Sequence, residues 1–403
     1  MKIFLLAILT LILLMLFISY VLFYIGCVRF KTTKYSHEKK FGKHAKTIEN
    51  GVNWFVSQKK EDITIAARDG TRLTAQFLPA RQSKGTIILF HGYRAQSFID
   101  FSCAYKMYHD LGYSILNVTQ RSHGMSGGTY ITFGVKERFD CLDWALYVLD
   151  RFGPASDIFL GGMSMGASTV LMAAGTKLPS NVRGIIADSG FSSPYDEFSH
   201  VLKRIHFPIH PFADIANVYA KVLAGFEFKE YSTIEAMKKN KIPVLFIHGE
   251  ADNFVPMKFS LESYDACISD KTLVTVADAG HGMAYLFDTP RCRRELFSFL
   301  SKNSTADFEA FTTIDESDFF EETDPGEAPN LTAAAVKISQ AESASESPAT
   351  SNPPEQLPPE ETVDFSDLDS LLDEIRRSDN LTDEDMKLWE GWNPLQLDED
   401  DTF

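Results

Sequence analysis

The sequence predicts an α/β fold in which helices cover both faces of a mostly parallel sheet. Short apolar runs recur at residues 86–90, 114–118, 158–160, 184–187, 244–248 and 273–276. They are continuous rather than alternating in polarity, which is typical of strands buried on both faces. Segments with helical periodicity separate them, which favours parallel strands joined by helices. Ligands of such sheets bind beyond the carboxyl ends of the strands, and the candidate functional residues lie there.

A β-hairpin is expected ahead of the parallel strands. Residues 63–68 and 71–79 are two strand-like segments, and Asp69-Gly70 between them is a typical hairpin turn.

The chain begins with an apolar run, residues 3–26, that contains no charged side chain. As a helix it would be roughly 36 Å long, enough to cross a hydrocarbon layer of roughly 30 Å. The run is longer than the apolar part of a typical cleavable signal peptide, and no small-x-small cleavage site follows it. We therefore expect residues 1–28 to be a single-pass transmembrane anchor. A cleaved signal sequence is the alternative.

Basic residues gather after this run, and we expect residues 29–59 to be a basic juxtamembrane linker. Because only Lys2 and the amino terminus precede the run, the positive-inside rule places the residues beyond Gly26 on the cytoplasmic side of the cell membrane. The same side chains also suit a solvated linker that touches anionic lipid. They are Arg29, Lys31, Lys34, Lys39, Lys40, Lys43 and Lys46.

The acidic character of the chain comes from its carboxyl-terminal quarter. Residues 301–403 hold 28 Asp and Glu against 5 Lys and Arg, a balance of −23. The whole chain carries −16, so residues 1–300 carry +7 and the low pI gives no information about the substrate. We expect residues 303–403 to be an acidic, mostly disordered tail. Its islands at 366–377 and 386–395 are either docking helices for a protein partner or transient helices in solvent.

Residues 60–302 are expected to form the folded α/β domain, interrupted by an insertion at about 191–241. The insertion is rich in Phe, His and Pro and has a helical pattern at about 215–223. Its position suits a small lid over the pocket. A helix with an ordinary connecting loop is the alternative.

The five cysteines are odd in number and have no C-x-x-C spacing, which argues against a metal site or a disulfide framework. They are Cys27, Cys103, Cys141, Cys267 and Cys292. The glycines at 124–128 lack the lysine and the spacing of a phosphate loop. No metal, nucleotide or other cofactor is expected, and no nucleic-acid partner.

A candidate nucleophile lies in Gly162-Met163-Ser164-Met165-Gly166, between an expected strand and an expected helix. This pattern is typical of a serine held at a sharp bend, where the flanking glycines approach neighbouring backbone too closely to carry a Cβ. The bend aims the start of the following helix, and the Met165 N–H, at a developing negative charge.

A serine hydroxyl needs a general base, and the base needs an anion to orient it. Asp252 follows the strand at 244–248, and His281 follows the strand at 273–276. Gly280 and Gly282 should let the loop bring the imidazole over Ser164. Asp188 is the alternative acid, and Asp278 on the histidine's own loop is a weaker one. His248 and His91 precede glycines at strand ends, where histidines more often satisfy backbone groups.

The second oxyanion donor should be the backbone N–H of Tyr93, in the loop His91-Gly92-Tyr93-Arg94. Losing one such donor typically costs roughly 3–4 kcal/mol of transition-state stabilisation.

These motifs, with the segment from Gln120 to Gly128, resemble the α/β-hydrolase superfamily. The most similar branch is the bacterial serine-aminopeptidase-like and prolyl-oligopeptidase-like group, over residues 60–300. The resemblance implies an α/β-hydrolase fold with Ser164 as nucleophile, Asp252 as acid, His281 as base, and Tyr93 and Met165 as oxyanion amides. Gln120 departs from the family, where many members have Asp. That Asp is usually structural, so the departure concerns the loop rather than the chemistry.

The sequence therefore predicts a membrane-anchored serine hydrolase that cleaves carboxylic esters through an acyl-enzyme. A peptidase, aminopeptidase or thioesterase is the alternative, and Asp196-Glu197 is a candidate acidic pair for a substrate amine. A non-catalytic scaffold at the membrane is a further alternative.

Overall fold

The computed structural model describes residues 1–30, 42–95 and 97–306. The chain divides into two compact units. Residues 42–45 belong to the second unit, and Gly42–His44 form one 3₁₀ turn (η1) there. All other described residues belong to the first unit. The predicted tail beyond residue 306, with both of its islands, lies outside the described residues, as do linker residues 31–41.

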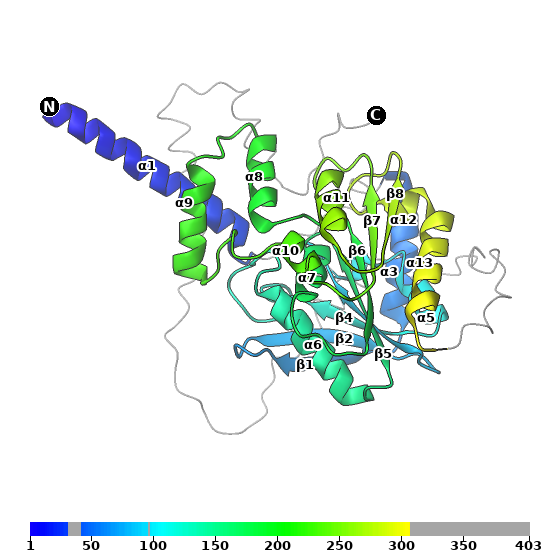
Figure 1. Ribbon diagram of the computed structural model, residues 1–403. Helices are drawn as coiled ribbons and strands as arrows, with labels where there is room; N and C mark the ends of the chain where they lie inside the picture. The colour runs from blue at the N-terminus through cyan, green and yellow to red at the C-terminus, as the bar shows by residue number, and fades with distance from the viewer. Residues whose placement is uncertain (31–41, 96, 307–403) are drawn as a thin grey trace, which may run out of the picture. The chain divides into compact units, whose positions relative to one another are not determined.

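The expected sheet is present, with eight strands in the order β1-β2-β4-β3-β5-β6-β7-β8 (Figure 1). β1 and β2 form the expected antiparallel hairpin, and β2 pairs antiparallel with β4. β3 to β8 are parallel, so the predicted parallel strands are confirmed. The bounds are β1 Glu61–Ala66, β2 Arg72–Leu78, β3 Gly85–Phe90, β4 Ser114–Thr119, β5 Asp157–Met163, β6 Val182–Asp188, β7 Val244–Gly249 and β8 Lys271–Val276.

Helices cover both faces of the sheet, as predicted. Ile88 of β3 packs in one apolar cluster with Trp144 of α6, whereas Ile87 packs in another with residues of α3, α5 and α13. Neighbouring residues of a strand point to opposite faces, which explains the division. Figure 1 shows α3 and α13 on the opposite side of the sheet from α6 and α7. The helices outside the insertion are α1 Lys2–Cys27, α3 Ala45–Ser57, α4 Ser97–Asp100, α5 Tyr105–Asp110, α6 Glu137–Phe152, α7 Met165–Ala173, α11 Met257–Ala266, α12 Ala284–Phe287 and α13 Thr289–Asn303.

Helix α3 lies inside the segment that was expected to be a linker. Ile48, Val52 and Phe55 recur at helical spacing and are buried. The ring of Phe55 stacks on Tyr105, with 4.0 Å between the ring centroids. A Cβ at Gly51 would overlap the backbone carbonyl of Ser102, so glycine lets α3 pack this closely. The expectation of a linker over residues 29–59 therefore does not hold for α3, which is part of the folded domain.

The insertion holds four helical elements between β6 and β7: α8 Pro194–Arg204, α9 Phe212–Tyr219, the π-helical η2 Ala220–Ala224 and α10 Thr233–Met237. The helix expected at 215–223 lies within α9 and η2. The sequence interpretation missed α8, although its start carries a clear signal. Ser193 caps α8 by accepting a hydrogen bond from the Asp196 N–H, and Pro194 takes the first helical position.

Helix α1 has 26 residues and, by length and composition, is long and apolar enough to cross a membrane. Its last turns pack on the insertion. Phe23 and Cys27 are at most 1 % exposed and belong to one apolar cluster with Ala216, Ala220 and Phe228. Figure 1 shows α9 crossing α1 near its carboxyl end. The end of the predicted anchor is therefore part of the core of the domain.

Candidate active site

Ser164 lies at the sharp bend between β5 and α7, as its flanking glycines predict. Its φ of 55° and ψ of −118° are strained values for a residue with a side chain. Its N–H donates to the Asp188 carbonyl over 2.8 Å. A Cβ at Gly162 would overlap the Gly166 carbonyl, and one at Gly166 would overlap the Phe90 carbonyl. The steric reason for both glycines is therefore confirmed.

Asp252 and His281 come together from two different loops. The Nδ1 of His281 lies 2.7 Å from the Oδ2 of Asp252, which is 5 % exposed. The other carboxylate oxygen accepts hydrogen bonds from the N–H groups of Phe254 and Val255, at 2.9 and 2.8 Å. Burial alone would raise the pKa of Asp252, but the charges and hydrogen bonds of His281 and His248 hold it well below its usual range. Asp252 is thus an ionised acceptor that fixes Nδ1 of His281 as a donor.

The His281 loop packs beside the nucleophile turn. Gly282 has a φ of 65°, and a Cβ there would lie 3.0 Å from Sδ of Met163, the residue before Ser164. The glycine requirement predicted for residue 282 is therefore real. Gly280 differs, because a Cβ there would meet nothing within 4 Å and its φ is not positive. Among the described residues, no hydrogen bond joins Ser164 to His281.

The two alternative acids do not bond to His281. Asp188 accepts a hydrogen bond from the Ser189 hydroxyl over 2.9 Å, and its Oδ2 has no partner. Burial raises the pKa of Asp188 to about 6. Asp278 is exposed and has a φ of 58°. The geometry thus favours Asp252 as the partner of the histidine.

His248 and His91 satisfy neighbouring groups, as expected for histidines at strand ends. The Nε2 of His248 donates to the Val255 carbonyl over 2.8 Å and also lies 3.2 Å from Oδ2 of Asp252. Its Nδ1 lies 2.7 Å from the Ser260 hydroxyl. The Nδ1 of His91 donates to the Gly92 carbonyl, and its Nε2 accepts from the Gln120 N–H. Burial lowers the pKa of His91, in keeping with a neutral ring.

The loop with Tyr93 lies directly beside Ser164. A Cβ at Gly92 would lie 3.4 Å from the Ser164 Cβ, and the Gly92 N–H donates to Asp100 Oδ2 over 2.7 Å. The Arg94 N–H donates to Nε2 of His123, over 3.0 Å. On the other side of Ser164, Met165 is the first residue of α7, so its N–H is one of the free donors of a first helical turn.

Gln120, which departs from the family pattern, connects this loop to α7. Its Nε2 donates to the His91 carbonyl over 2.5 Å, and its Oε1 accepts from the Thr169 hydroxyl over 3.3 Å. An aspartate cannot donate to a carbonyl, so the amide is suited to this bond. Having Gln at position 120 in place of Asp therefore changes how the loop with Tyr93 is held in position.

The end of α1 is bound by the same loop, a contact that the sequence interpretation missed. The Tyr93 hydroxyl donates to the Gly26 carbonyl over 2.8 Å, and the Arg94 guanidinium donates to the Val28 carbonyl over 2.9 Å. Val28 also forms an antiparallel bridge with Tyr130. No local pattern indicates these contacts, because the partners lie more than 60 positions apart in the sequence.

Glu197 of α8 is a buried carboxyl group without a hydrogen-bond partner at Oε2. Burial and the nearby Asp252 carboxylate raise its pKa to about 8. Asp196 is exposed instead and accepts a hydrogen bond from the Ser193 hydroxyl over 2.6 Å. The two residues face different surroundings, so the acidic pair predicted from the sequence is not formed.

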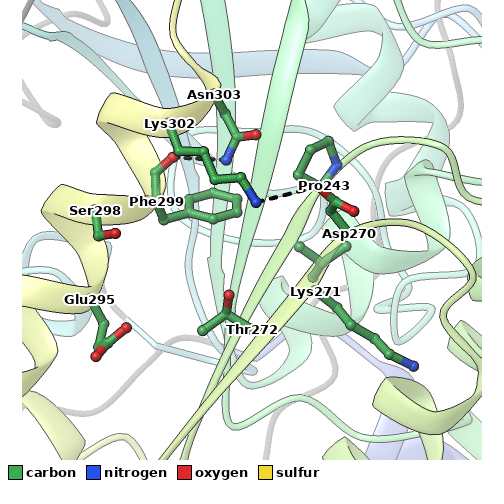
Figure 2. Close-up of a pocket in the computed structure, with 10 residues that line it drawn as sticks. Pro243, Asp270, Lys271, Thr272, Glu295, Ser298, Phe299, Lys302 and Asn303 are labelled. Atoms are coloured by element: carbon green, nitrogen blue, oxygen red, sulfur yellow. Dashed lines mark hydrogen bonds and ion pairs between the residues drawn. The ribbon is translucent and has the colours of Figure 1, made fainter.

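The pocket of about 160 Å³ in Figure 2 lies away from this site. Its lining includes the first residues of β7 and β8, and therefore lies at the opposite edge of the sheet from the loops that follow their carboxyl ends. An exposed ion pair between Lys302 and Asp270, at 3.4 Å, borders it. Among the residues that the structure describes, no group of three or more His, Cys, Asp or Glu side chains is arranged to hold a metal ion.

The family of the chain follows from a match over residues 102–307 to the model of the prolyl oligopeptidase family. The chain belongs to the prolyl oligopeptidase family. The matched segment contains Ser164, Asp252 and His281 and the strands β4 to β8, whereas the loop with Tyr93 precedes it. The family consists of serine hydrolases, and the likeness expected from the motifs is thereby confirmed.

Individual relatives of this prolyl oligopeptidase family member are distant. YqkD of Bacillus subtilis (strain 168) is 26 % identical over 256 residues, which cover 62 % of this chain and 84 % of YqkD. YfhR of Escherichia coli (strain K12) is 25 % identical over 229 residues, which cover 55 % of this chain and 73 % of YfhR. The solved esterase Pf2001 of Pyrococcus furiosus has a TM-score of 0.52 at 21 % identity. The match covers 62 % of this chain and 94 % of the esterase. That likeness supports the fold alone.

The buried carboxyl of Glu197 predicts a stability difference that depends on pH. Its pKa is about 8 in the folded chain and 4.5 ordinarily, so its stabilising contribution is complete below pH 4.5 and is lost as the pH rises to about 8. Glutamine does not ionise. We expect Glu197→Gln to raise the urea midpoint, relative to the unmodified protein, more at about pH 9 than at about pH 5.

The matched control is Glu262→Gln, at an exposed glutamate of α11. It should change the midpoint equally at both pH values. Equal shifts at both pH values for Glu197→Gln would contradict this prediction, because they would show that the carboxyl of Glu197 is already ionised in the folded chain at about pH 5.

Proposed function

We propose that this protein is a membrane-anchored serine hydrolase that cleaves carboxylic esters through an acyl-enzyme. The observation that carries the proposal is the hydrogen bond between His281 and the buried Asp252, on a loop that packs beside the strained turn of Ser164. Family membership supports the general class of reaction.

In this mechanism Ser164 Oγ attacks the ester carbonyl while His281 Nε2 takes its proton. Asp252 keeps Nδ1 of His281 protonated and stabilises the imidazolium. His281 then gives the proton to the leaving alkoxide, and the acyl group stays on Ser164. Water, deprotonated by His281, attacks the acyl-enzyme and releases the carboxylic acid as Ser164 regains its proton.

The oxyanion of each tetrahedral intermediate would be held by the N–H groups of Tyr93 and Met165. Two features support this assignment. Gly92 brings the Tyr93 loop beside Ser164, and Met165 begins α7. Fixed donors at the point where charge develops are usually the largest single contribution to such catalysis.

A small-molecule ester with an apolar acyl or aryl group is the substrate class that fits best. Residues beside the proposed nucleophile belong to an apolar cluster that includes Met165, Phe191 and Val255, with Tyr93 and Phe254 partly buried against it. An ester also needs the least assistance to its leaving group. The insertion, residues 191–241, would act as a lid over this surface.

The alternative activities are a peptidase, an aminopeptidase or a thioesterase. An aminopeptidase would need an ionised acidic group for the substrate amine, and Glu197, with its pKa raised to about 8, suits that role poorly. A non-catalytic scaffold that recruits a protein through the tail is a different class of function, and the bond between His281 and Asp252 argues against it.

Retention of α1 as a single-pass anchor is favoured over its removal as a signal sequence. Removal would uncover the surface buried by Phe23 and Cys27 and would leave the Tyr93 hydroxyl and Arg94 guanidinium without their α1 partners. We propose a cell-membrane protein with its catalytic domain on the cytoplasmic side, following the basic residues after α1.

Replacing the proposed nucleophile tests the reaction. The full-length protein in detergent should hydrolyse p-nitrophenyl esters from acetate to dodecanoate, and Ser164→Ala should lower kcat by roughly 10⁴ or more. The full chain is required because α1 contributes to the core. If both proteins are equally inert toward esters, thioesters and peptide amides, the scaffold is the better account.

The identity of the acid is tested by comparing two buried aspartates. Asp252→Asn should lower kcat by about 10⁴, because the amide favours the wrong tautomer of His281. Asp188→Asn should reduce kcat by less than about tenfold, since its side chain bonds to Ser189 rather than to the histidine. The opposite ranking would make Asp188 the acid.

A further inference from the structure

Helix α9 and its continuation η2 have one face packed on α1 and another face open. Small residues, Ala216 and Ala220 among them, form the packed face and allow close approach to α1. The open face carries three aliphatic side chains: Val218 is 56 % exposed, Val222 72 % and Leu223 45 %. Aliphatic residues gathered within six positions of one helical segment suggest an apolar contact surface.

The position of α9 along α1 indicates what covers this surface. Ser19 is the first buried residue of α1, and those before it are largely exposed. From Ile3 to Ser19, α1 is roughly 25 Å long, close to the thickness of a hydrocarbon layer of about 30 Å. If α1 spans a bilayer, α9 therefore crosses α1 at the depth where the chain leaves the hydrocarbon.

Tyrosines gather at the same level, as they do where membrane proteins meet the headgroup region. The ring of Tyr20 lies 5.5 Å from that of Tyr219 on α9 and 6.0 Å from that of Tyr24, measured between centroids. Phe23 lies 5.8 Å from Tyr130. Lys221, 64 % exposed at its side chain, lies among the aliphatic residues in the sequence and pairs with Glu227 at 2.7 Å. Exposed aliphatic and basic residues on one helical segment are typical of helices that lie in a bilayer interface.

A series of aromatic contacts leads from this region toward the site. Phe228 belongs to the cluster formed with Phe23 of α1, and its ring lies 5.9 Å from that of Phe133. Phe133 in turn stacks on Tyr93 at 5.3 Å. The packed face of α9 and the loop beside Ser164 are thus connected through apolar side chains.

We propose that the α9 surface, formed by Val218, Val222 and Leu223, rests in the bilayer interface and that the ester substrate is an amphiphile dissolved in that bilayer. The proposal rests on the proposed function, namely a hydrolase anchored by α1. It deepens that function by naming the substrate class and the side from which the substrate arrives. A second copy of the chain and a soluble protein partner are the competing occupants of the surface.

Site-directed fluorescence in the full-length protein tests the contact with lipid. The protein is reconstituted in vesicles of phosphatidylcholine and phosphatidylglycerol, and a polarity-sensitive dye is attached to Val222→Cys in a Cys103→Ser background. The other four cysteines are buried and should not react. The control is Ile268→Cys, an aliphatic position that is 67 % exposed and precedes β8, at the opposite edge of the sheet from the site.

The dye at residue 222 should shift to the blue and be quenched by lipid that carries a spin label near its headgroup, and the dye at residue 268 should do neither. Equal quenching at both positions would overturn the proposal. A blue shift without lipid quenching would also overturn it, because it indicates a protein occupant. These readouts do not depend on hydrolysis, so they are distinct from a failure of the proposed reaction.

The substrate class is tested with Val222→Glu and its control Ile268→Glu. Val222→Glu should lower hydrolysis of vesicle-borne p-nitrophenyl dodecanoate by roughly tenfold, the scale of losing one buried valine side chain. Hydrolysis of soluble p-nitrophenyl acetate should not change, and Ile268→Glu should affect neither rate. Equal rates on the vesicle-borne ester for both variants, or a parallel loss on both esters, would contradict the proposed substrate class.

Discussion

The buried carboxylate of Asp252 is the interaction on which the candidate site depends. One of its oxygens bonds to His281, and the other accepts two backbone N–H groups from the residues that follow it. The carboxylate thereby fixes both the tautomer of the histidine and the shape of its own loop. Glu197 of α8 lies close enough for its pKa to rise in response to this charge, so the insertion and the site share one electrostatic environment.

Helix α1 places a second constraint on the same site. Its final carbonyl groups are bound by the side chains of Tyr93 and Arg94, whose backbone belongs to the loop beside Ser164. The last turns of α1 belong to one apolar cluster with α9, so packing as well as chain connectivity joins the proposed anchor to the domain. The proposed anchor, lid and oxyanion loop are therefore in direct contact. This arrangement fits the proposal that the substrate reaches the site from the bilayer.

The sequence was sufficient for the parallel strands and for the Ser164 turn, because continuous apolar runs and close-packed glycines are local signals. Helix α3 was missed although Ile48, Val52 and Phe55 have helical spacing, since surrounding lysines favoured a linker. Helix α8 was also missed, although Ser193 followed by Pro194 is a typical start of a helix. The burial of Glu197 and the contacts of Arg94 were not predictable, because their causes are tertiary neighbours far away in the sequence.

The central claim is that Ser164 is an activated nucleophile, and covalent labelling tests it most directly. A fluorophosphonate reacts far faster with such a serine than with an ordinary hydroxyl group, forming a phosphorus–oxygen bond with loss of fluoride. Intact-protein mass spectrometry of the full chain should detect one adduct, and peptide mapping should locate it at Ser164, with no adduct in Ser164→Ala. An unlabelled protein, or an adduct at another residue, would contradict the account.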